Sequence, residues 1–152
     1  MTMDAHVFSN KKVKSIQEWQ SNIDIIGFGL KINSSENPQI LSGHLPAEWA
    51  KREAGFECGP HDVADLMATY HDIDFGGPWM YAYSFHWGSL PACIGAVIAA
   101  SAYAHATNGL FFDPQDSLLL QPDEAIRYAR DTELRFPKIE AVLANLAHKF
   151  ER

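Results

Sequence analysis

The stretch WMYAYSFHWGSLPACIGAVIAASAYAHATNGLFF, residues 79–112, decides the fold of this chain. Residues 79–87 alternate aromatic side chains with smaller ones, which is the period of a β-strand with one aromatic face. Ser89 can cap the helix that follows, and the Ala and Gly content of that helix lets a sheet approach closely. The run 110–112 predicts a second strand, so we expect a right-handed crossover with Phe85 and Phe111 on neighbouring parallel strands.

The segments around this stretch indicate helices packed on a sheet. No Asp, Glu, Lys or Arg occurs in residues 75–112, so most of this run is expected inside the core. Before it, apolar residues at helical spacing predict an amphipathic helix that ends at Gly27, and residues 28–32 predict a short strand. The residues of this helical stripe are Val13, Ile16, Trp19, Ile23 and Ile26.

Two helices are predicted after the second strand. Pro122 followed by two acidic residues is typical of a helix N-terminus. A second amphipathic helix, starting at Pro137, is expected either to dock on the fold or to pair with another chain, for example in a homodimer. Its apolar stripe consists of Ile139, Val142, Leu143, Leu146 and Phe150.

The length of 152 residues and an apolar content of 47% fit one ordinary core. We therefore predict a single α+β domain over residues 1–152, with a small mixed sheet, a strand-helix-strand crossover, helices packed on the sheet and a C-terminal helix. Residues 40–58 leave two alternatives open: a helix over 46–54, or a hairpin that turns at residues 51–53.

Composition argues against several classes of function. The net charge is −7, from 19 acidic and 12 basic residues, and the only basic cluster is Lys11, Lys12 and Lys14, so nucleic acid is not an expected partner. Cys58 and Cys93 lack the spacing of a disulfide framework or a structural zinc site. The longest apolar stretch is shorter than the roughly 20 residues of a bilayer span, so we expect a soluble, cytoplasmic protein without a membrane partner.

Two His-Asp pairs, in HDVAD at 61–65 and HDID at 71–74, admit two interpretations. A small metal-dependent hydrolase could use His61, Asp62, His71 and Asp72, with His44 and Asp113 as further ligands. Against it, hydrolases built on His-Asp pairs are helical, whereas this chain has an aromatic strand at its centre.

The other interpretation is an acidic surface for a basic partner. Asp62 and Asp65 are expected on the outer face of a short helix, with further acids in the loop that follows. The candidate partner-binding residues are Glu57, Asp62, Asp65, His71, Asp72 and Asp74. This interpretation involves neither a metal nor a cofactor.

The segments FHWG (85–88), NGLFFDPQD (108–116) and QPDEAIRYAR (121–130), with the Ala-rich helix between them, resemble a group of small bacterial immunity-type proteins. Proteins of this kind accompany secreted antibacterial toxins, of the contact-dependent or type VI systems. The resemblance extends more weakly to GFGLKI, SGHLP and AGFECG, and it favours the hairpin for residues 44–58. It implies a cytoplasmic protein that binds and neutralises a cognate toxin domain without doing chemistry itself.

Overall fold

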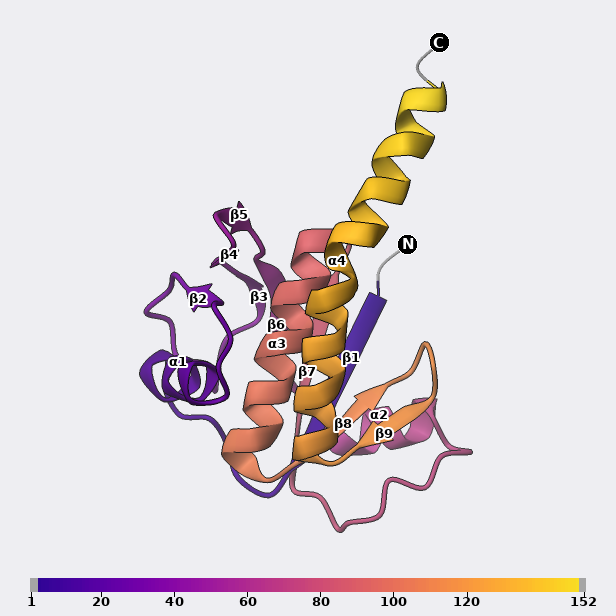
Figure 1. Cartoon of the computed structure of the whole chain (residues 1–152). Coiled ribbons are helices and arrows are strands. Elements are labelled where there is room, and N and C mark those ends of the chain that lie inside the picture. The colour runs from indigo at the N-terminus through magenta and orange to yellow at the C-terminus, as the bar shows by residue number, and fades with distance from the viewer. Residues whose placement is uncertain (1–2, 151–152) are drawn as a thin grey trace.

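The computed structural model describes residues 3–150, and the side chains of residues 3–147. Its centre is a six-stranded sheet with the spatial order β3-β6-β7-β1-β8-β9 (Figure 1). Each described strand pairing is antiparallel, and the α+β class predicted from the sequence is confirmed. The strands are β1 (Met3–Ser9), β3 (Gly43–Leu45), β6 (Phe56–His61), β7 (Tyr81–Trp87), β8 (Leu110–Asp113) and β9 (Leu118–Leu120).

The N-terminal strand β1 lies between β7 and β8. Val7 is opposite Tyr83 on one side and opposite Phe111 on the other. β7 and β8 therefore run in the same direction but are hydrogen-bonded to β1, and the prediction that Phe85 and Phe111 occupy neighbouring strands was wrong. The cause is that residues 3–9 were given no strand in the sequence prediction, although this strand fills the middle of the sheet.

The region of residues 43–61 is β-structure, as the resemblance favoured, and not a helix. β3 pairs with β6, with Leu45 opposite Phe56. Inside this hairpin, β4 (Ala47–Trp49) turns into β5 (Arg52–Glu53) and also pairs with β2 (Lys31–Ile32) in a three-stranded sheet. Ala50 and Lys51 form the turn with φ values of 49° and 63°, as in a type I′ hairpin, so the turn lies earlier than the predicted residues 51–53.

Helices cover both faces of the large sheet. α1 (Ile16–Ile25), α3 (Leu90–Thr107) and the first half of α4 (Pro122–Phe150) pack on one face, while the short helix α2 (Val63–Thr69) lies on the other (Figure 1). The predicted cap of α3 is present, because the Ser89 hydroxyl accepts a hydrogen bond from the Ala92 N–H at 3.4 Å.

Side chains along β1 and β7 point alternately to the two faces of the sheet, so the interior is divided into two cores. Tyr83 and Phe85 are 2% and 0% exposed and pack edge-on against Trp19 of α1, which confirms the expected aromatic face within β7. Trp79 precedes β7 and packs on the smaller core, so the predicted strand over residues 79–87 began two residues too early. On the opposite face of the sheet, Phe8 and Phe112 belong to the smaller core beneath α2. The large core also has the predicted close approach of helix and sheet, because a Cβ at Gly95 would collide with the backbone carbonyl of Ala54.

α4 is one continuous helix with Pro137 in its interior, so the prediction of two separate helices was wrong. Its first half packs on α3, whereas its second half projects beyond the body of the fold (Figure 1). Phe136 is the last deeply buried residue among the described side chains, and the described part of the predicted stripe is exposed from Ile139 to Leu146. The side chain of Phe150 lies outside the described residues, and pairing of this helix in a homodimer stays a prediction.

α3 is the one described helix with the length and apolar composition of a membrane span, and 72% of it is buried inside the fold. Such burial is typical of the core helix of a soluble domain.

Candidate functional site

Five of the predicted partner-binding residues lie on α2, at its N-cap or in the loop after it, and we call them the acidic surface: Asp62, Asp65, His71, Asp72 and Asp74. The four carboxylates and the imidazole of His71 are all exposed. Asp62 is the N-cap of α2, because its Oδ1 accepts hydrogen bonds from the N–H groups of Ala64 at 2.7 Å and Asp65 at 3.3 Å. In the loop after α2, Asp74 Oδ1 accepts from the Gly76 N–H at 2.9 Å. Within residues 3–147, no Lys or Arg forms an ion pair with any of these carboxylates.

Glu57, the sixth predicted residue, lies neither on α2 nor in the loop after it. It is on β6, opposite His44 of β3 and His86 of β7, so these three side chains share one face of the sheet. Glu57 and His86 both line two shallow cavities, of about 340 Å³ and 220 Å³, to which Asp65, His71, Asp72 and Asp74 do not contribute. The smaller of these cavities also contains His61, the neighbour of Asp62, and whether Glu57 contributes to the same binding site as the α2 acids stays a prediction.

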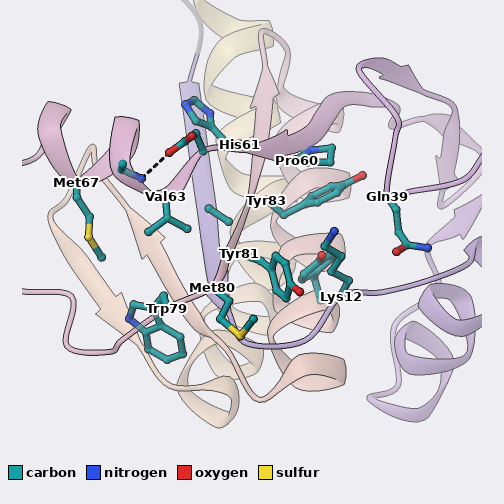
Figure 2. A pocket seen from close by; sticks show the side chains of 14 residues that line it. Lys12, Gln39, Pro60, His61, Val63, Met67, Trp79, Met80, Tyr81 and Tyr83 are labelled. Atoms are coloured by element: carbon teal, nitrogen blue, oxygen red, sulfur yellow. Dashed lines mark hydrogen bonds between the residues drawn. The ribbon is translucent and has the colours of Figure 1, made fainter.

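A larger cavity, of about 510 Å³, lies beside α2, and we call it the Met80 groove (Figure 2). Val63 and Met67 of α2 form one wall, and Trp79, Met80 and Tyr81 at the start of β7 form the floor and the second wall. Asp62 of the acidic surface and Lys12 also line it. Met80 is 65% exposed, which is unusual for a large apolar side chain that enters a core strand.

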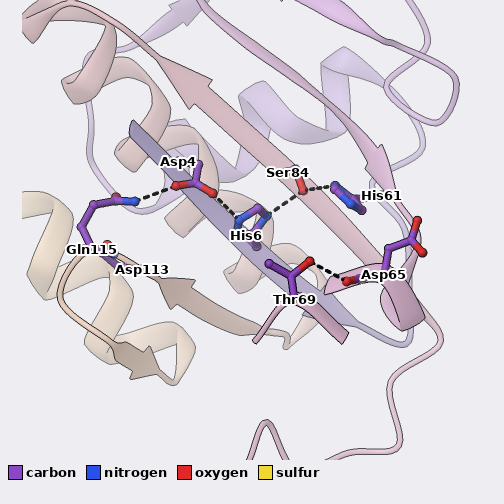
Figure 3. Close-up of polar contacts among 8 residues, drawn as sticks. All are labelled: Asp4, His6, His61, Asp65, Thr69, Ser84, Asp113 and Gln115. Atoms are coloured by element: carbon purple, nitrogen blue, oxygen red, sulfur yellow. Dashed lines mark hydrogen bonds and ion pairs between the residues drawn. The ribbon is translucent and has the colours of Figure 1, made fainter. Parts of the chain in front are cut away.

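A chain of hydrogen bonds connects β1, β7 and β6 on the face of the large sheet that α2 covers. His6 donates from Nε2 to Asp4 Oδ2 at 2.8 Å, and its Nδ1 lies 2.7 Å from the Ser84 hydroxyl (Figure 3). Ser84 Oγ lies 3.0 Å from His61 Nδ1, and Gln115 donates to the other oxygen of Asp4 at 2.6 Å. His6 is 2% exposed and Ser84 is 4% exposed, so the centre of the chain is shielded from water.

The carboxylate fixes the order of donors along this chain. Because Asp4 can only accept, a neutral His6 carries its proton on Nε2 and accepts from the Ser84 hydroxyl through Nδ1. Ser84 then accepts from His61 Nδ1–H, which leaves His61 Nε2 as a hydrogen-bond acceptor. His61 thus presents a lone pair rather than a proton at its free nitrogen while both imidazoles are neutral.

The pKa values along the chain follow from this arrangement. Burial lowers the pKa of His61, and the nearby His6 lowers it further against the opposing charge of Asp65. Burial raises the pKa of Asp4, but the hydrogen bond and charge of His6, the hydrogen bond from Gln115 and the charge of His86 together outweigh it, so the pKa is lowered overall. The pKa of Tyr70 is raised by burial and then by the charge of Asp4.

The side chains of His61 and Asp62 make separate contacts in the structure. The imidazole of His61 is bonded to Ser84, while the carboxylate of Asp62 caps α2. Across the described side chains, no three His, Cys, Asp or Glu residues converge as a group that could hold a metal ion. The ligand set of the hydrolase interpretation, from His44 to Asp113, is therefore not assembled in this structure.

The two cysteines are partly or fully buried thiols. Burial raises the pKa of Cys58 to about 12 and that of Cys93 to about 11. The raised pKa disfavours the thiolate form of Cys93, although this residue lies in the first turn of α3.

Sequence analysis missed Asp4, His6 and Ser84 because it assigned no strand to residues 3–9. The signal was present, since Ala5 and Val7 alternate with His6 and Phe8. The sequence alone does not show that Ser84 has polar partners, because these partners come from the neighbouring strands β1 and β6.

Fold and surface together define a small α+β domain with an exposed acidic surface beside an apolar groove. Comparison with protein-family models, curated proteins and solved structures gives no match to this chain.

Proposed function

We propose that this protein is a cytoplasmic immunity protein that binds a basic bacterial toxin domain and neutralises it by occupying its surface. The observation that carries the proposal is the acidic surface, whose four carboxylates are exposed and have no basic partner among the described side chains. Toxins that act on anionic substrates have cationic clefts, and a cluster of free carboxylates is complementary to such a cleft.

Two of the four carboxylates of the acidic surface are held by hydrogen bonds before binding. The N-cap bonds hold the Asp62 side chain, and the bond to Gly76 holds that of Asp74. Side chains fixed in this way lose less conformational entropy when a partner binds. The net charge of −7 adds a long-range attraction that speeds the encounter with a cationic surface.

The test begins with a search of the neighbouring open reading frames for a basic toxin domain, and the affinity for that domain is then measured by calorimetry at low and at raised salt. Replacing Asp72 and Asp74 by Lys is expected to weaken the complex by about 2–5 kcal/mol if both carboxylates are buried on binding. The matched control replaces the exposed Glu36 and Glu48 by Lys, which changes the net charge equally at another part of the surface.

Each result has a clear meaning. Loss of affinity in the Asp72 and Asp74 variant, with the control unchanged, supports the acidic surface as the binding site. Equal affinity of both variants removes this surface from the proposal. Failure of the unaltered protein to bind or inhibit the adjacent toxin contradicts the proposed function itself.

A further inference from the structure

We propose that the Met80 groove binds a protein segment in which an apolar side chain lies between a basic and an acidic residue, the basic residue facing α2 and the acidic residue facing Lys12. The inference rests on the proposed function, because it names a contact site for the same partner. It goes further by assigning that contact to an apolar cavity with walls of opposite charge.

Exposed apolar side chains mark the groove as a contact surface. Met80 is 65% exposed, and Ile40, which follows the groove residue Gln39, is 79% exposed. Methionine adapts its shape to different apolar partners, and aromatic residues such as Trp79 frequently dominate binding energies. A cavity of about 510 Å³ has room for one large apolar side chain and the stem of a neighbouring one.

The segment that carries Met80 is held in place although its side chain is exposed. Asn10 accepts a hydrogen bond from the Met80 N–H at 2.8 Å and donates to the Pro78 carbonyl at 3.2 Å. The Trp79 indole N–H donates to the Phe75 carbonyl at 2.8 Å, and Phe75 is itself buried against Phe8. The floor of the groove is therefore formed before any partner arrives.

The two walls carry opposite charges. Asp62 lines the α2 side, with the exposed Asp65 on the next part of the same helix. On the other side, Lys12 lies 4.6 Å from the centre of the Tyr81 ring, and an adjoining cavity contains Lys11 and Lys14. Charges of opposite sign across an apolar groove favour one orientation of a bound segment and disfavour the reverse.

The experiment needs no toxin, so its result is independent of the test of the proposed function. The chain contains four methionines. Met67 and Met80 line the groove, whereas Met3 packs on the large core and serves as the internal control. Protein labelled with ¹³C at the methionine methyl groups is titrated with tryptamine, indole-3-propionate and the neutral tryptophol. These probes share one apolar ring and differ in the charge of their side chain.

We expect the methyl signals of Met67 and Met80 to shift in a saturable way while Met3 stays unchanged. Both charged probes should bind about two- to fivefold more tightly than tryptophol. Asp62→Asn, which retains the capping oxygen, should remove the advantage of tryptamine alone, and Lys12→Gln should remove that of indole-3-propionate alone.

Several outcomes would overturn the inference. Shifts that do not saturate, or that affect Met3 equally, mean that no groove site exists. An advantage for tryptamine that persists in Asp62→Asn reflects only the overall negative charge of the protein. If indole-3-propionate binds no better than tryptophol, the groove lacks its positive wall. The toxin-binding result with the Asp72 and Asp74 variant decides the proposed function separately.

Discussion

The buried imidazole of His6 donates to the carboxylate of Asp4 across 2.8 Å, and both residues belong to the central strand of the sheet. The same imidazole contacts Ser84 at 2.7 Å, and Ser84 connects it to His61 at 3.0 Å. A histidine that is 2% exposed is costly to bury unless both nitrogens are bonded, so this chain explains how a polar residue occupies the middle of the sheet.

Replacing His6 by Ala is therefore expected to destabilise the fold by about 2–4 kcal/mol, because Asp4 and Ser84 each lose one of their two side-chain partners and a buried cavity is left. The free energy of unfolding in urea measures this loss. His71→Ala is the matched control, since His71 is exposed and is expected to change stability by no more than about 0.5 kcal/mol. Equal stability of the two variants would mean that the buried chain contributes nothing.

Stability should fall on acidification in two stages. The pKa of His61 is lowered in the folded state, so the unfolded chain binds its proton first and stability declines as pH falls below the ordinary value of 6.5. The pKa of Asp4 is also lowered, so a second decline follows as pH falls below 3.8. Unfolding free energies measured from pH 8 to pH 3 test both, and His61→Asn should flatten only the first decline.

Gly95→Ala should destabilise the protein by about 1–3 kcal/mol, because the added methyl group collides with the Ala54 carbonyl and separates α3 from the hairpin of residues 43–61. Gly29→Ala is the control, since nothing lies within 4 Å of a Cβ at that position. Thermal unfolding of the two variants compares them directly. A Gly95→Ala protein as stable as the control would show that helix and hairpin are not in close contact.

The two halves of α4 should respond differently to truncation of apolar side chains. Phe136 is 3% exposed, with its ring 4.9 Å from that of Trp49 and 5.2 Å from the Arg52 guanidinium, so Phe136→Ala is expected to cost about 3–5 kcal/mol. Leu143 is 52% exposed, and Leu143→Ala should cost no more than about 0.5 kcal/mol at low protein concentration. A large loss for Leu143→Ala would mean that its side chain is covered.

The sequence predicted the parts of the fold that depend on local signals. The period of two in residues 81–87, the cap at Ser89 and the spacing of Ile16, Trp19 and Ile23 each specify their own element, and these elements are present. Local signals do not specify which strands become neighbours. The pairing of β1 with both β7 and β8 depends on residues that are far apart in the chain.

The candidate site likewise has features that local sequence signals predict and features that depend on contacts between distant elements. The exposed carboxylate of Asp65 follows from the period of one short helix and could be placed in advance, whereas Asp62, expected on the same helical face, caps the helix instead. The Met80 groove and the chain from Asp4 to His61 each combine side chains from several elements. Pro137 misled the prediction for a different reason: a proline usually marks the start of a helix, but an exposed helix interior can accept one at a cost in hydrogen bonding.

The central position of β1 has a consequence for synthesis on the ribosome. β1 emerges before the other strands of the large sheet. Its two neighbours, β7 and β8, become available only when residues 81–87 and 110–113 have been translated. Until then its apolar residues have no sheet to join, and sheet formation must wait for contacts between distant parts of the chain, which slows folding. The six-stranded sheet can therefore be completed only after residues 110–113 have left the ribosome.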